Sequence, residues 1–211
     1  MALFIDSAIA DEVREAMSWG FVAGVTTNPS LMALARRPAE EVIEELCRLT
    51  SGPVFYQVTK IDPRDCEAEA RRFAAISPGQ IVLKIPCTLN GLIVAARLSP
   101  NIPCAATAVF SPAQTFLAVE AGVRYVIPYV NRATRLMGDG LALVRAMADV
   151  AASSRRGAEV LAASLKTPDE VAGALLSGAH HVTIPPAVIK AMAEHEYTLA
   201  AIEEFARAKS G

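Results

Sequence analysis

The chain has 211 residues, of which 53% are hydrophobic, and its formal net charge is -2 at pH 7. This length suits one domain, and the near-neutral charge without a basic stripe argues against a nucleic-acid partner. No apolar run approaches the roughly 18 to 20 residues of a membrane helix. The N-terminus lacks the basic start and long apolar stretch of a signal peptide, so we expect a cytoplasmic protein with no membrane partner.

Short runs typical of β-strands alternate with helical stretches along the whole chain. The eight predicted strands span residues 3–5, 24–26, 54–58, 81–85, 105–109, 125–129, 160–163 and 181–184. Between them, residues 40–49 and 141–151 place apolar side chains at helical spacing. Ser111 and Thr167 each precede a proline, as N-caps often do, and Glu170 stands at the capping-box position after Thr167.

This alternation predicts a parallel sheet with right-handed crossovers. Eight repeats favour a closed (β/α)8 TIM barrel over an open doubly wound sheet. No G-x-G-x-x-G or Walker motif supports nucleotide binding. No linker divides the chain, so we expect one barrel domain spanning residues 1–211. After the last strand, residues 185–193 and 197–208 predict two more helices.

The second of these helices carries an apolar face that a free tail does not need. Ile202, Phe205 and Ala206 share this face. It packs either against its own barrel or on a neighbouring subunit, and we expect the segment 197–211 to dock on a neighbour.

Lys84 lies inside the apolar strand predicted for residues 81–85. Burial disfavours the charged form of a lysine and lowers its pKa, and a neutral amine attacks carbonyl carbons to form a Schiff base. A lysine at a strand end also reaches water by snorkelling. The sequence of residues 81–86 alone favours neither of these two alternatives.

Other predicted strands also end in polar residues, and barrel enzymes place their chemistry at the carboxyl ends of strands. Taken singly, each residue has a structural explanation: Asp6 as a cap, Asn28 as a turn residue, Thr107 as an ordinary strand residue and Tyr129 as a core aromatic. Together they surround one barrel mouth, where unpaired polar groups are costly. The strand-end residues are Asp6, Thr26, Asn28, Gln57, Thr107, Tyr129 and Ser164.

These groups suit a class I aldol reaction, in which an iminium on Lys84 accepts electrons as a carbon–carbon bond breaks. Gln57, Thr107 and Tyr129 are candidates to hold a water that relays protons, and Asp6 is a candidate proton acceptor. Arg132, after the sixth strand, and Lys166, after the seventh, are suited to a phosphate. Each is otherwise an ordinary solvated side chain.

Five blocks of the sequence resemble the transaldolase family, in its small-subunit branch of fructose-6-phosphate aldolases and short transaldolases. The blocks are G-V-T-T-N-P-S at 24–30, V-L-K-I-P at 82–86, T-A-V-F at 107–110, P-Y-V-N-R at 128–132 and A-A-S-L-K at 162–166. They cover the chain in order, and the first two are highly specific together.

The resemblance implies catalysis by Lys84, Asp6, Gln57, Thr107 and Tyr129. It also implies that Asp6 and Asn28 contact the donor hydroxyls with Thr26 close by, that Arg132, Ser164 and Lys166 bind the acceptor's phosphate, and that no metal or organic cofactor is needed. The implied partners are dihydroxyacetone-type molecules, sugar phosphates and other copies of the chain, in a homo-pentamer or a decamer of two stacked rings.

Two positions separate the branches of this family. Short transaldolases usually carry glutamate and phenylalanine where this chain has Gln57 and Tyr129, so the resemblance favours an aldolase that cleaves fructose 6-phosphate. A transaldolase that passes dihydroxyacetone between sugar phosphates is the alternative. Ile127 and Leu165 depart from the family pattern and leave open whether the acceptor pocket is altered, and with it the identity of the acceptor.

Two other classes of protein remain as rivals. A non-catalytic sugar-phosphate-binding barrel would bind a ligand without forming a covalent adduct. A metal enzyme would use His180, His181 and His195, but neighbouring histidines on a strand point to opposite faces, so a shared metal is not expected.

Overall fold

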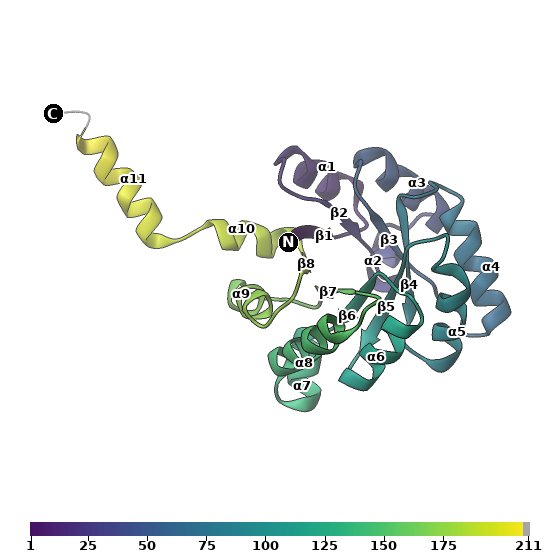
Figure 1. Cartoon of the computed structure of the whole chain (residues 1–211). Coiled ribbons are helices and arrows are strands. Elements are labelled where there is room, and N and C mark those ends of the chain that lie inside the picture. The colour runs from purple at the N-terminus through teal and green to yellow at the C-terminus, as the bar shows by residue number, and fades with distance from the viewer. Residues whose placement is uncertain (209–211) are drawn as a thin grey trace.

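The computed structural model of the protein describes residues 1–208. In this range eight parallel strands pair in chain order and close into a barrel (Figure 1). The predicted (β/α)8 barrel is confirmed, and each predicted strand overlaps an observed one. The strands are β1 (Ala2–Asp6), β2 (Gly24–Thr26), β3 (Val54–Gln57), β4 (Ile81–Pro86), β5 (Cys104–Val109), β6 (Tyr125–Pro128), β7 (Glu159–Ala162) and β8 (His181–Ile184).

Helices cover the outside of the barrel, and side chains at their first turns fix where several of them begin. The hydroxyls of Ser111 and Thr167 accept hydrogen bonds from backbone N–H groups three residues on, so both predicted caps are confirmed. The helices are α1 (Ala10–Ser18), α2 (Pro29–Leu34), α3 (Ala39–Leu49), α4 (Pro63–Ala74), α5 (Leu89–Leu98), α6 (Pro112–Glu120), α7 (Val130–Met137), α8 (Gly140–Ser153), α9 (Pro168–Leu176), α10 (Pro186–Ala193) and α11 (Glu196–Ala208).

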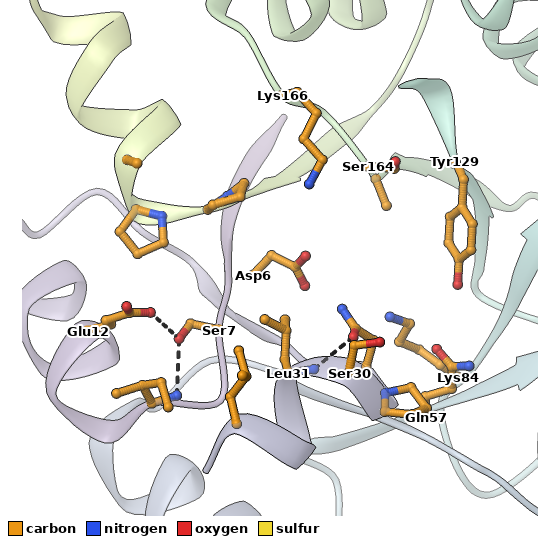
Figure 2. Close-up of a pocket in the computed structure, with 18 of the residues that line it drawn as sticks. Asp6, Ser7, Glu12, Ser30, Leu31, Gln57, Lys84, Tyr129, Ser164 and Lys166 are labelled. Atoms are coloured by element: carbon orange, nitrogen blue, oxygen red, sulfur yellow. Dashed lines mark hydrogen bonds between the residues drawn. The ribbon is translucent and has the colours of Figure 1, made fainter. Parts of the chain in front are cut away.

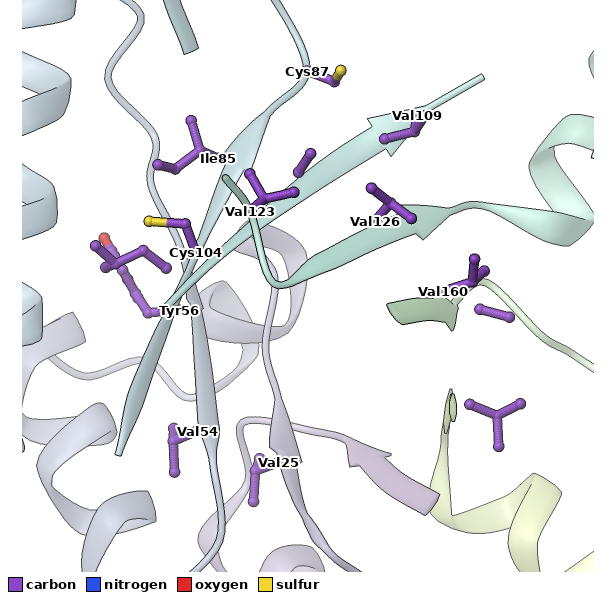
Figure 3. Close-up of a cluster of buried hydrophobic side chains, with 14 of the residues drawn as sticks. Val25, Val54, Tyr56, Ile85, Cys87, Cys104, Val109, Val123, Val126 and Val160 are labelled. Atoms are coloured by element: carbon purple, nitrogen blue, oxygen red, sulfur yellow. The ribbon is translucent and has the colours of Figure 1, made fainter. Parts of the chain in front are cut away.

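Two apolar layers hold the barrel together. Outward-facing strand residues such as Val25, Val54 and Val126 pack in the layer between sheet and helices (Figure 3). A second cluster fills the barrel interior, where the rings of Phe4 and Phe55 meet edge to face at 5.3 Å. Burying each large side chain contributes about 1.5 to 3 kcal/mol. The interior is therefore a packed floor beneath the carboxyl ends of the strands.

The amino-terminal end of the barrel holds a half-buried histidine, His181. Its Nε2 lies 3.3 Å from Oε2 of Glu159, but the two groups are not oriented for a hydrogen bond. Burial lowers the pKa of His181 from its ordinary value of 6.5, and the Glu159 carboxylate opposes this only in part. The ring is therefore neutral at pH 7. His180 faces elsewhere and accepts a hydrogen bond from the Val160 N–H.

Helix α10 packs at the edge of the barrel and buries Val188 and Ile189, whereas α11 stands away from it (Figure 1). Its apolar side chains are exposed, with Ile202 at 57% and Phe205 at 67%. The alternative that this face packs on its own barrel is therefore wrong, while docking on a neighbour stays a prediction. Residues 209–211 of the predicted segment lie outside the described residues. No helix in residues 1–208 combines the length and apolarity needed to cross a bilayer.

Candidate active site

A pocket of about 880 Å³ opens where the carboxyl ends of the strands meet (Figure 2). Eight of the ten residues expected at the site line it: Asp6, Asn28, Gln57, Lys84, Tyr129, Arg132, Ser164 and Lys166. The other two, Thr26 and Thr107, are buried beneath the lining and hydrogen-bonded to members of it. The barrel thus gathers all ten at one mouth.

Lys84 reaches this pocket from inside the barrel wall and is only 3% exposed. Side chains two residues apart on a strand share a face, so Lys84 stands directly above Val82 of the apolar interior. Its Nζ donates a hydrogen bond to the Thr27 carbonyl at 2.8 Å. Burial lowers its pKa from 10.5 to about 8, and the Asp6 carboxylate acts in the opposite direction. The snorkelling alternative is wrong, because this amine is buried.

A chain of hydroxyls fixes the Asp6 carboxylate. Thr26 Oγ1 donates to Asp6 Oδ1 at 2.8 Å and lies 2.6 Å from Thr183 Oγ1. Because Thr26 has one proton and gives it to Asp6, Thr183 is the donor to Thr26. Thr183 was not predicted to belong to the site, although it occupies the last inward-facing position of β8, which could have indicated its role.

Tyr129 directly follows β6, and its hydroxyl forms a second hydroxyl pair, with Thr107. Its Oη and Thr107 Oγ1 are 2.8 Å apart. A register shift in β5 at Ala108, whose φ is 57°, redirects the strand just after Thr107. Burial raises the pKa of Tyr129, while Thr107 and Arg132 oppose the rise. The phenol therefore keeps its proton and can donate it into the pocket.

Two side-chain amides, those of Asn28 and Gln57, also line the pocket. Asn28 Oδ1 accepts from Leu31 N at 3.1 Å and caps α2, so this residue has the expected turn role and also lines the pocket. Gln57 Oε1 is buried and has no hydrogen-bond partner among residues 1–208. A buried amide oxygen without a partner is costly. It is a natural acceptor for a water or a substrate hydroxyl in this pocket.

The expected anion-binding residues come from the first turn of α7, which follows β6, and from the loop after β7. The Lys166 amine extends into the pocket, and Ser164 and Tyr129 stand beside it (Figure 2). The Arg132 guanidinium lies 4.9 Å from the centre of the Tyr129 ring. Ser164 has a φ of 59°, a conformation unusual for residues other than glycine. Two cations and a hydroxyl thus line the same pocket.

Glu170, on α9, links these two segments and was not predicted to be part of the site. One of its carboxylate oxygens accepts from Asn131 Nδ2 at 2.7 Å, and the other accepts from Lys166 N at 2.6 Å. The predicted capping box needs a correction, since Glu170 binds the N–H of Lys166 and not that of the cap residue Thr167. Its capping-box position was the signal that placed it near the loop.

Both departures from the family pattern lie outside the pocket. Ile127 is buried in the barrel interior and Leu165 in the layer beneath the helices, and neither lines the pocket. Any effect of these residues on the acceptor is therefore indirect. Among residues 1–208, no group of three or more histidine, cysteine, aspartate or glutamate side chains is placed to hold a metal ion.

Known proteins resemble this chain over nearly its whole length. Residues 3–210 match the family model described as transaldolase/fructose-6-phosphate aldolase. A protein of Symbiobacterium thermophilum named "Probable transaldolase" is 40% identical over 206 residues, covering 97% of this chain and 95% of the relative. One of Aquifex aeolicus with the same name is 36% identical, covering 97% of this chain and 94% of the relative.

Proposed function

The chain belongs to the transaldolase/fructose-6-phosphate aldolase family, and from this we propose that it is a class I aldolase. It cleaves fructose 6-phosphate reversibly into dihydroxyacetone and glyceraldehyde 3-phosphate. The observation that carries the proposal is the buried Lys84, whose pKa is lowered to about 8 and whose amine shares a pocket with Asp6 and Tyr129.

The reaction begins at the Lys84 amine. Its lone pair attacks C2 of the open-chain ketose, and the carbinolamine loses water to give an iminium. Asp6 takes the proton from the C4 hydroxyl as the C3–C4 bond breaks, and the electron pair of that bond moves into the iminium. Glyceraldehyde 3-phosphate leaves, and an enamine of dihydroxyacetone remains on Lys84. The hydrogen-bond chain from Thr183 through Thr26 keeps Asp6 aimed at the substrate.

The fate of the enamine decides between aldolase and transaldolase. Protonation at C3 regenerates an iminium, and water then adds at C2 and frees dihydroxyacetone. We assign the proton to the Tyr129 phenol, acting through a water held with Gln57 and Thr107. The paired hydroxyls of Thr107 and Tyr129 and the unpartnered Gln57 oxygen support this assignment.

The phosphate of the aldehyde half is assigned to Arg132, Ser164 and Lys166. Arginine offers a planar fork of donors and lysine a compact charge, which together suit a phosphate. All three residues line the pocket, and the Arg132 guanidinium lies 4.9 Å from the centre of the Tyr129 ring. A carboxylate in place of the phosphate would meet the same donors.

A transaldolase is the second candidate, and the names of the relatives favour it. In that reaction the enamine waits and attacks another aldehyde instead of being protonated. The test measures free dihydroxyacetone from fructose 6-phosphate alone, and sedoheptulose 7-phosphate when erythrose 4-phosphate is added. Release that exceeds transfer supports the aldolase. Dominant transfer with negligible release overturns it. A Lys84→Met variant is the inactive control.

We also propose that the protein is cytoplasmic and that it forms a homo-oligomer. The exposed apolar side chains of α11, among them Tyr197 and Phe205, support the second. Light scattering during size-exclusion chromatography of the full chain, and of a chain ending at residue 195, tests it. A monomer in both cases contradicts the expected oligomer.

A further inference from the structure

Two charged side chains are buried among residues 1–208, Lys84 at 3% exposure and Glu69 at 6%. The mechanism uses the first and gives no role to the second. Glu69 lies on α4 and does not line the pocket. A buried carboxylate costs free energy unless it is well hydrogen-bonded, so its partners indicate what it stabilises.

All of the side chain's partners are donors, and all come from the end of β3 or the turn that follows. Tyr56 Oη donates to Glu69 Oε1 at 2.7 Å. The Thr59 hydroxyl donates at 3.0 Å and its N–H at 3.1 Å, while the Lys60 N–H donates at 2.9 Å. Burial alone would raise the pKa of Glu69, but these hydrogen bonds hold it below its ordinary value. The side chain is therefore a carboxylate.

The segment that Glu69 holds contains Gln57. Tyr56 faces outward from the sheet, in the layer shown in Figure 3, and stacks on Phe73 of α4 with ring centres 3.6 Å apart. Gln57 is the next residue, faces the pocket and pairs in register with Lys84. After Gln57, the Val58 N–H bonds the Lys84 carbonyl at 3.0 Å, and the chain then turns away from the sheet.

The Glu69 carboxylate therefore accepts hydrogen bonds from residues on both sides of Gln57. Tyr56 precedes Gln57 in the chain, and Thr59 and Lys60 follow it. We propose that Glu69 is a positioning residue that holds the Gln57 amide at the reactive carbon carried by Lys84. The proposal rests on the proposed function, in which Gln57 helps to hold the water that releases dihydroxyacetone. Glu69 itself touches neither substrate nor the reacting atoms.

The variant Glu69→Gln tests this with little change in size. An amide nitrogen accepts no hydrogen bond, so half of the acceptor is lost while every partner remains a donor. Small displacements of a catalytic group cost up to about a hundredfold in rate. We expect kcat for fructose 6-phosphate cleavage to fall roughly tenfold, with KM within about twofold of the wild type.

The decisive readout is the ratio of dihydroxyacetone release to transfer onto erythrose 4-phosphate, because a loss of folded protein does not alter a ratio. Gln57→Ala and Glu69→Gln should both lower release relative to transfer. The double variant should match Gln57→Ala alone, since both changes remove one function. An unchanged ratio in Glu69→Gln, or separate effects that multiply in the double variant, overturns the proposal.

Two further variants supply a control and a second test. Glu159→Gln removes a carboxylate at the opposite end of the barrel and should leave the ratio unchanged. Thr59→Val deletes only the hydroxyl donor to Glu69, so it supplies the same test at smaller amplitude if Glu69→Gln does not fold. A ratio that stays at the wild-type value in folded Thr59→Val counts against the proposal.

Failure of this inference is distinguishable from failure of the proposed function. If borohydride traps no substrate adduct on wild-type Lys84, the aldolase proposal fails. If the adduct forms in the wild type and in Glu69→Gln, but the ratio does not move, only the role of Glu69 fails.

Discussion

The lowered pKa of Lys84 makes a quantitative prediction about the pH dependence of the enzyme. The pKa falls from 10.5 to about 8, a difference of about 2.5, which corresponds to roughly 3.4 kcal/mol at 1.36 kcal/mol per unit. At pH 7 the buried amine is therefore neutral about 300 times more often than a lysine with the ordinary value. Only the neutral amine attacks the ketone.

The assay is kcat/KM for fructose 6-phosphate cleavage above about pH 7, where the substrate phosphate has already titrated. This quantity reports ionisations of the free enzyme. We expect it to rise with pH and to level off above about pH 8, following the pKa of Lys84. A rise that continues to about pH 10 without levelling would refute the argument from burial.

A variant sharpens this test. The Asp6 carboxylate raises the pKa of Lys84 against the effect of burial. Removing that charge in Asp6→Asn should therefore move the pKa of Lys84 downward. Because Asp6 also acts in carbon–carbon cleavage, the measured quantity is adduct formation with dihydroxyacetone at each pH, quenched with borohydride. A midpoint that moves upward would contradict the assignment.

Three further predictions follow from the same geometry. Tyr129→Phe removes the proton donor and should shift the enamine from release toward transfer, and an unchanged ratio counts against the role of Tyr129. Lys166→Met should lower kcat/KM for fructose 6-phosphate by roughly tenfold, or about 1.4 kcal/mol, without affecting adduct formation by unphosphorylated dihydroxyacetone; an equal loss with both refutes a phosphate contact. Because the folded state holds the pKa of His181 below 6.5, the unfolded chain binds the proton first, so the free energy of unfolding should fall as pH drops below about 6.5. Urea titrations between about pH 7 and pH 5 should show a smaller fall in His181→Gln, and an equal fall would contradict this.

The barrel was predictable because its signals are local and repeated. Each strand is a short apolar run, and the caps at Ser111 and Thr167 mark helix starts through their own side chains. The inward positions could also be inferred, since Lys84, Gln57 and Thr107 each lie at a strand end. Side chains at these ends must converge once the sheet closes.

Contacts between distant segments were not predictable in the same way. Glu69 and Thr59 are ten residues apart, and Thr26 and Thr183 are 157 apart. Nothing in the spacing of these residues marks them as partners, because the register of the closed barrel decides which hydroxyls meet. Glu170 was predicted only in part. The local capping signal correctly placed it in the first turn of a helix, but its carboxylate accepts a hydrogen bond from Lys166 N and not from Thr167 N.

The most direct test of the account is to identify the residue that carries the substrate. The protein is incubated with fructose 6-phosphate, reduced with borohydride and digested, and the peptides are analysed by mass. We expect one reduced dihydroxyacetone adduct, on the peptide that contains Lys84, and none in Lys84→Met. The absence of an adduct in the active wild-type protein, or an adduct on another lysine, would contradict the central claim.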